Sequence, residues 1–186
     1  MPVTRVPYEI EGWGTGEVWL DGTRLVWHEL PRPTASEADR GTFPHPGGGD
    51  SHRPLRATLP AQRSRMGGTS ASIAQRLVHR IECYFAGEHV GFDDVEIDAD
   101  DWTTFQLDVL RTLRSVPYGE VVSYGELAGV AGHPSAQRAA GTFCAQNRYP
   151  LVVPCHRVVS ASGLGGYGSL GREYKRRLLE LEGVAV

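Results

Sequence analysis

A long interruption in the hydrophobic pattern constrains the fold of this chain more than any other feature. Between Pro31 and about Ser70 the sequence is dominated by Pro, Gly, Ser, Arg and Asp, which bury little apolar surface. We therefore expect a mobile loop over residues 31–70. Before it, apolar and polar residues alternate as in strands, and Asp21-Gly22 has the chemistry of a hairpin turn. The first part of the chain is predicted to form a small antiparallel sheet.

After the interruption, apolar residues recur at the spacing of a helix instead of alternating with polar ones. A helix is predicted to begin near Ser70 and to end at Gly87. Its apolar stripe consists of Ile73, Leu77, Ile81, Tyr84 and Phe85. One short strand is expected over residues 90–97, followed by a second helix from Trp102 that stops before Pro117.

Two short helices are predicted in the next segment. Ser123 and Glu126 match a capping box that opens the first of them, and Gly132-His133-Pro134 breaks it. Ser135 is expected to cap the second, over about residues 136–146. Two short helices across a brief turn that contains glycine are the outline of a helix-turn-helix, although any pair of packed helices can show it.

The rest of the chain completes the predicted organisation. A buried strand or extended run is expected at residues 151–153, and a last helix over residues 172–182 closes at Gly183. The acidic stretch 98–101 marks a boundary. We predict an α/β protein of the α+β type, in which domain 1–98 holds a small antiparallel sheet with a helix. Domain 99–186 is then a helical domain with the helix-turn-helix.

Charge and cysteine content limit the class of protein. Residues 1–101 carry 10 Arg and 16 acidic residues, whereas residues 102–186 carry 8 Arg and one Lys against 6 acidic residues. Residues 102–186 could therefore bind a polyanion. Three cysteines, an odd number, do not make a disulfide framework, and no apolar run approaches the roughly 20 residues of a membrane span. We expect a cytoplasmic protein without a metal or other cofactor.

Cys155 and His156 raise the question of a nucleophile and its base. A thiol needs a base, a cation or a helix N-terminus to become an effective nucleophile. Adjacent residues of an extended chain point to opposite faces, so a direct bond between these side chains requires a turn, or else a water must bridge them. From the dipeptide alone, a structural buried cysteine is the alternative.

The surrounding sequence strongly resembles a known active-site segment. The run Asn147-Arg148-Tyr149-Pro150-Leu151-Val152-Val153-Pro154-Cys155-His156-Arg157-Val158-Val159 is similar to that of the O6-alkylguanine-DNA alkyltransferases, also called methylated-DNA–protein-cysteine methyltransferases. Tyr124, Arg138 and Glu182 also match the family at its spacings. The resemblance is strong over residues 102–186 and looser over residues 1–101.

The resemblance implies a DNA repair reaction. In the family, the alkylated guanine is flipped out of the duplex, and the cysteine, here Cys155, takes the alkyl group in one irreversible turnover. Glu182 would hold His156, which would take the thiol proton through a water. Tyr124 would offer its hydroxyl to the purine ring, and Asn147 would organise the turn before the active-site segment.

The resemblance also implies how DNA and the lesion are held. Arg138 would fill the vacated space in the base stack while its helix lies in the minor groove. Other DNA contacts are expected from Ser123, Ala136, Gln137, Ala139 and Gly141. The lesion pocket would include Val158, Tyr167 and Ser169. The expected partner is duplex DNA with O6-alkylguanine, with O4-alkylthymine as a second expected substrate. The protein is expected to act as a monomer without a membrane or an obligate protein partner.

Three other functions compete with alkyl transfer. A non-catalytic sensor of alkylated bases would keep the DNA-binding fold but lack the cysteine, whereas Cys155 is present. A transcriptional regulator would need a polar recognition helix, whereas residues 136–140 are mostly small. A Cys–His hydrolase would need an oxyanion hole that nothing in the sequence specifies.

Overall fold

The N-terminal part of the computed structural model is a three-stranded antiparallel sheet. The structure describes residues 3–33 and 70–185, so most of the loop expected over residues 31–70 lies outside the described residues. The strands are β1 (Thr4–Ile10), β2 (Gly14–Asp21) and β3 (Arg24–Arg32), in the order β1-β2-β3. Gly22, with φ of +61°, forms the predicted turn between β2 and β3. The antiparallel sheet is confirmed.

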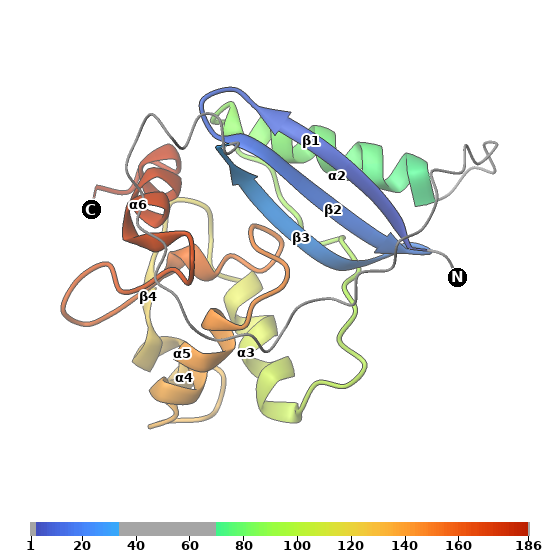
Figure 1. Cartoon of the computed structure of the whole chain (residues 1–186). Coiled ribbons are helices and arrows are strands. Elements are labelled where there is room, and N and C mark those ends of the chain that lie inside the picture. The colour runs from blue at the N-terminus through green and yellow to red at the C-terminus, as the bar shows by residue number, and fades with distance from the viewer. Residues whose placement is uncertain (1–2, 34–69, 186) are drawn as a thin grey trace.

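Helix α2 (Ser70–Phe85) lies across one face of this sheet (Figure 1). The predicted apolar stripe is largely confirmed, because Leu77, Ile81, Tyr84 and Phe85 are buried. Ile73 is only partly buried, and Ala74 takes a place in the core instead. Val18, Leu20 and Leu25 of the sheet belong to the same hydrophobic core. Burial of these side chains supplies the main driving force for packing the helix on the sheet.

The C-terminal part is built from short helices around a two-stranded parallel pairing (Figure 1). Its elements are α3 (Thr104–Arg114), β4 (Val122–Ser123), α4 (Tyr124–Val130), α5 (Gln137–Ala145), the 3-10 turn η1 (Cys155–Arg157), β5 (Val158–Val159) and α6 (Gly171–Leu181). Helices α4 and α5 pack on each other as the predicted helix-turn-helix pair. Among the described residues, no helix is long and apolar enough to cross a membrane.

Side-chain caps open helices α3 and α4 but not α5 or α6. Ser123 forms the predicted capping box with Glu126 at the start of α4, and Thr103 forms another with Gln106 at the start of α3. The prediction that Ser135 caps α5 is wrong. Ser135 adopts a φ of +73°, and the N-cap position is held by Ala136 without a side-chain hydrogen bond.

Two predicted strands are also wrong. Residues 90–97 contain turns and a single bridge from Ile97 to Leu25, because the backbone there pairs with β3 only at its end. Residues 151–153 are buried as expected but form turns. Leu151 has a φ of +68°, and the Val153 N–H donates to the Tyr149 carbonyl at 2.7 Å.

Strand β3 is joined to the segment that leads into the Cys155 turn. The His28 backbone N–H donates to the Arg148 carbonyl at 2.9 Å, and His28 Nδ1 donates to the Pro150 carbonyl at 2.7 Å. Nε2 of the same ring lies 2.7 Å from the Tyr8 hydroxyl. A neutral imidazole donates at Nδ1 and accepts at Nε2 from the Tyr8 hydroxyl, which shares its one hydrogen with the Glu29 carbonyl at 3.0 Å. Burial lowers the pKa of His28 to about 4, although the bond to Pro150 opposes this shift.

This contact makes stability depend on pH. Because the folded pKa of His28 is below its unfolded value, the unfolded chain binds the proton first and the folded state loses stability as pH falls. We expect His28 to account for a loss of about 2 kcal/mol in the free energy of unfolding between about pH 7 and about pH 5. Urea denaturation of wild type and His28→Gln at both pH values measures this loss.

The matched control is His79→Gln, since the His79 side chain is exposed. The control should lose as much stability on acidification as the wild type, and His28→Gln should lose less. An equal acid loss in all three proteins would contradict the assignment to His28.

Candidate active site

Cys155 begins the tight turn η1 and is almost fully buried. Asn147 Nδ2 donates to Cys155 Sγ at 3.0 Å and to the Val153 carbonyl at 2.8 Å, while Asn147 Oδ1 accepts the Tyr149 N–H at 3.0 Å. Asn147 therefore joins the end of α5 to the turn that carries the thiol. Burial raises the pKa of the Cys155 thiol, and the Asn147 amide opposes that rise by stabilising the thiolate.

The carboxylate of Glu182 lies at the centre of a buried polar network. Oε1 accepts from His156 Nε2 at 2.7 Å, and Oε2 accepts from Arg157 Nε at 3.0 Å and from the Gly119 N–H at 3.1 Å. Arg157 Nη2 also donates to Oε1 at 3.0 Å. Burial raises the pKa of Glu182, but the bonds and charges of His156 and Arg157 outweigh it and hold the pKa at about 2. The carboxylate therefore stays ionised.

This carboxylate determines which nitrogen of His156 is basic. Because an ionised carboxylate can only accept, the hydrogen of the neutral ring must be on Nε2, and Nδ1 keeps its lone pair. Nδ1 is buried and forms no hydrogen bond with any described residue. Burial lowers the pKa of His156, so the ring is neutral and able to take a proton. The structure records no direct bond from His156 to Cys155 within the described residues.

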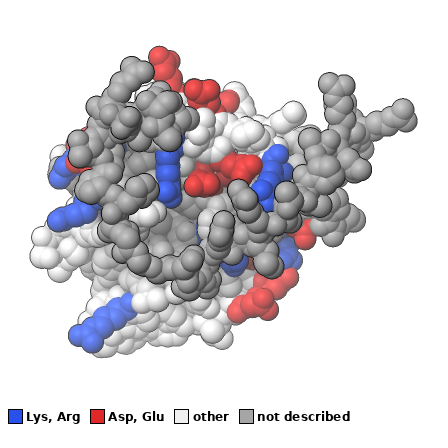
Figure 2. All heavy atoms as spheres, in the orientation of Figure 1, with Lys and Arg blue, Asp and Glu red and all other residues white. Residues whose placement is uncertain are grey.

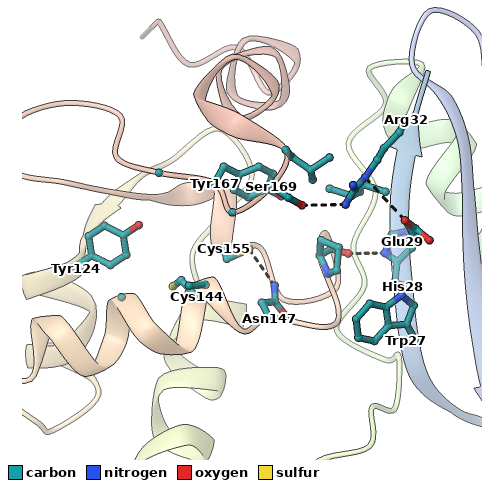
Figure 3. A pocket seen from close by; sticks show the side chains of 17 residues that line it. Trp27, His28, Glu29, Arg32, Tyr124, Cys144, Asn147, Cys155, Tyr167 and Ser169 are labelled. Atoms are coloured by element: carbon teal, nitrogen blue, oxygen red, sulfur yellow. Dashed lines mark hydrogen bonds and ion pairs between the residues drawn. The ribbon is translucent and has the colours of Figure 1, made fainter. Parts of the chain in front are cut away.

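A pocket of about 330 Å³ opens beside Cys155 (Figure 3). Tyr124 lines it from α4, and Gly141 and Cys144 line it from α5. The loop after β5 contributes the predicted pocket residues Tyr167 and Ser169. The Tyr167 hydroxyl is buried beside Cys155, where it joins the Asn147 amide in opposing the rise that burial causes in the pKa of the thiol. Burial raises the pKa of Tyr124, so its hydroxyl keeps a proton that it can donate.

Val158, the remaining predicted pocket residue, does not line this pocket. It is fully buried in β5, and its carbonyl accepts from Lys175 Nζ at 2.5 Å. Lys175 is also fully buried, and its charge opposes the effect of burial on the pKa of Cys155. The pocket beside Cys155 is thus lined by four other predicted catalytic and pocket residues, Tyr124, Asn147, Tyr167 and Ser169, whereas His156, Glu182 and Val158 are buried and do not line it.

The predicted DNA-contacting residues lie on or next to the pair α4–α5. Gln137, Arg138 and Ala139 are exposed, and Arg138 makes no side-chain hydrogen bond or ion pair with any described residue. Ala136 and Gly141 are half-buried, and Gly141 faces the ring of Tyr124. Ser123 is engaged at the cap of α4, with its hydroxyl oxygen 3.1 Å from the Glu126 N–H.

Charge on the molecular surface agrees with this placement. In the view of Figure 2, acidic and basic side chains lie together over the region of the sheet, whereas the region of α4 and α5 shows basic and uncharged atoms. Small side chains and backbone there leave α5 open to close approach by a polyanion.

Several site residues are absent from the sequence-based prediction. Strand β3 forms one wall of the pocket through Trp27, Glu29 and Arg32, and Arg32 Nη2 donates to Ser169 Oγ at 3.3 Å (Figure 3). Alternation places Trp27 and Glu29 on one face but Arg32 on the other, and a register shift between Glu29 and Arg32 brings all three to the same wall. Arg157 could have been assigned to the site from the sequence, because it directly follows His156 in the motif. Lys175 could not, since a lysine on a helix is ordinarily exposed.

Comparisons with known proteins agree with this geometry. Residues 104–184 match the family model described as "6-O-methylguanine DNA methyltransferase, DNA binding domain". A methylated-DNA–protein-cysteine methyltransferase of Methanopyrus kandleri is 44% identical over 134 residues, which cover 69% of this chain and 95% of that protein. A Mycobacterium tuberculosis protein of the same name is 50% identical over 106 residues, or 56% of this chain and 62% of the relative.

Solved structures extend the similarity to the N-terminal sheet. The O6-methylguanine methyltransferase of Mycobacterium tuberculosis matches with a TM-score of 0.66 and 34% identity, over 97% of this chain and 93% of that one. A complex of the Mycobacterium tuberculosis protein with DNA also matches with a TM-score of 0.66 and 34% identity, over 96% and 91% of the two chains. The resemblance seen in the sequence is confirmed, and the chain belongs to the methylated-DNA–protein-cysteine methyltransferase family.

Proposed function

We propose that this chain repairs alkylated DNA by moving an alkyl group from O6 of guanine to Sγ of Cys155. The observation that carries this proposal is the juxtaposition of a buried thiol, the neutral base His156 and the ionised Glu182 beside a pocket of about 330 Å³. The names of the relatives, methylated-DNA–protein-cysteine methyltransferases, support the same reaction.

The chemistry is a single displacement. The thiol proton passes to His156 Nδ1 through a bridging water, and the resulting thiolate attacks the alkyl carbon. A bond forms between sulfur and carbon, the bond from O6 to carbon breaks, and its electron pair stays with the guanine. Tyr124, which keeps its proton, donates a hydrogen bond to the purine as this charge develops. The product thioether does not hydrolyse, so each molecule reacts once.

The DNA partner follows from the surface of α5. An O6-alkyl group cannot reach Cys155 while its base is stacked, so the nucleotide must leave the duplex. Arg138, exposed and without a side-chain partner among the described residues, is suited to fill the space left in the stack from the minor groove. The backbone around Ala136, Gln137 and Ala139 would meet phosphates. The solved DNA complex of the mycobacterial relative supports DNA as the partner.

Other parts of the expectation remain predictions. We predict that the protein is a monomer in the cytoplasm without an obligate protein partner. We also predict that its two domains divide near residue 98 and that it acts on O4-alkylthymine. The alternative function, a sensor that binds alkylated bases without reacting, is disfavoured because Cys155 lies in the pocket with Asn147 bonded to its sulfur.

Replacing the proposed nucleophile separates reaction from binding. Cys155→Ala should abolish methyl transfer from an O6-methylguanine duplex, because no other group takes the place of the thiol. Its affinity for the same duplex should stay within about threefold of wild type, since exposed residues of α5 carry binding. Labelled-methyl transfer and fluorescence anisotropy measure the two properties.

Cys144→Ala is the matched control, because Cys144 lines the same pocket. The control should transfer the methyl group to completion. Residual transfer in Cys155→Ala, or loss of transfer in Cys144→Ala alone, would contradict the assignment of Cys155.

Arg138→Ala tests the extrusion of the base. Only a duplex substrate requires flipping, so the single-turnover rate on the O6-methylguanine duplex should fall by about tenfold or more. The rate with a free O6-benzylated guanine base should change little. Arg176→Ala, which removes a partly exposed arginine of α6 paired with Glu173, should leave both rates unchanged. Equal losses on both substrates with Arg138→Ala would rule out the stacking role.

A further inference from the structure

Tyr84 brings the N-terminal helix α2 into contact with the proposed alkyl-transfer centre. It lies in the last turn of α2, it is 1% exposed, and its hydroxyl donates to Glu182 Oε1 at 2.8 Å. The same hydroxyl oxygen lies 3.3 Å from His156 Nε2. Tyr84 lies outside residues 104–184, the segment that matches the family's DNA-binding domain.

The three polar atoms form a closed triangle. Glu182 Oε1 lies 2.7 Å from His156 Nε2 and 2.8 Å from the Tyr84 hydroxyl. The carboxylate has no hydrogen to give, so the hydroxyl donates to it and keeps its own lone pairs free. Those lone pairs are close to the N–H of His156 Nε2. His156 Nε2 nevertheless lies closer to the carboxylate oxygen, at 2.7 Å against 3.3 Å, so the main effect of the hydroxyl on the ring passes through Glu182 Oε1.

The ring of Tyr84 is held rigidly enough to fix the position of its hydroxyl. It packs edge-on against Phe85, with ring centroids 5.5 Å apart, and against Tyr118 at 6.1 Å. The ring of His156 itself lies at 6.3 Å in a similar tilted arrangement. Burial raises the pKa of Tyr84 well above its usual value, so the hydroxyl stays a donor throughout the range in which His156 titrates.

A buried tyrosine needs one hydrogen-bond partner, and a backbone carbonyl would serve for stability alone. Here the partner is a carboxylate oxygen that Arg157 already contacts through Nη2 at 3.0 Å. Every donor on Oε1 withdraws charge that would otherwise stabilise the protonated form of His156. The hydroxyl of Tyr84 thus acts on the same atom that orients the base.

We infer that Tyr84 is a positioning residue for alkyl transfer, whose hydroxyl holds Glu182 Oε1 against His156 and moderates the basicity of that ring. This inference rests on the proposed function, because it assigns His156 as the base. It also makes helix α2 part of the reacting centre, so the N-terminal sheet-and-helix unit contributes to the chemistry as well as to stability.

The test is the pH dependence of single-turnover methyl transfer by the full chain, with O6-methylguanine duplex as substrate. For Tyr84→Phe, we expect the rate at the alkaline plateau to fall about three- to tenfold, the effect of losing one hydrogen bond. The midpoint of the acid limb should move to higher pH. With one donor fewer, Oε1 carries more negative charge beside His156 and raises the pKa of that ring.

Tyr118→Phe is the matched control. Tyr118 belongs to the same aromatic cluster, but its hydroxyl donates to the Leu181 carbonyl at 2.9 Å and not to the carboxylate. The control loses a half-buried hydroxyl bond of similar length. It should keep both the plateau rate and the acid midpoint of wild type. Thermal unfolding of both variants shows whether they are folded to the same extent.

Each outcome decides one question. Absence of transfer by the wild type would reject the proposed function itself. Transfer by the wild type with an unchanged acid midpoint in Tyr84→Phe would overturn the inference and leave the proposed function standing. An equally large midpoint shift in Tyr118→Phe would also overturn the inference. A shift confined to Tyr84→Phe supports the positioning role.

Discussion

The buried carboxylate of Glu182 is the interaction on which the rest of the site depends. A charge removed from water is costly unless partners compensate it, and breaking one buried pair typically costs about 3–5 kcal/mol. Glu182 is 5% exposed and follows α6 directly. Its partners come from η1, from the turn at Gly119 and from α2. One ionised group therefore joins segments that are far apart in sequence.

The same network sets the protonation state of the reacting groups. Because the carboxylate accepts from Nε2, the free lone pair of His156 lies on Nδ1. Burial would keep the Cys155 thiol protonated, since it raises the pKa of the sulfur. Activation therefore requires a nearby base and stabilising contacts, which His156, Asn147 and Lys175 can provide together. A thiol that stays largely protonated until substrate binds is also protected from adventitious oxidation.

The parts of the fold that local chemistry determines could be predicted from the sequence. The hairpin at Gly22 and the capping box of Ser123 depend on neighbouring residues, and both are confirmed. The motif around Cys155 identified the family. The prediction for Ser135 is wrong. A serine before a helix usually caps it, but the backbone of Ser135 has a positive φ. The strand expected at residues 90–97 is absent because apolar content alone does not supply a pairing partner.

Contacts between distant segments could not be predicted from the sequence, because they depend on how the sheet and the helical part pack. The apolar stripe predicted that Tyr84 would be buried but not that its hydroxyl would meet Glu182, 98 residues away in the chain.

The most direct test of alkyl transfer to Cys155 is the mass of the intact wild-type protein after reaction with excess duplex that contains one O6-methylguanine. We expect a gain of one methylene per molecule that saturates, and peptide mapping should place it on Cys155 while Cys83 and Cys144 stay unmodified. Unchanged mass with the lesion duplex still bound would contradict alkyl transfer and indicate a sensor. A methylene on another residue would contradict the assignment of the nucleophile.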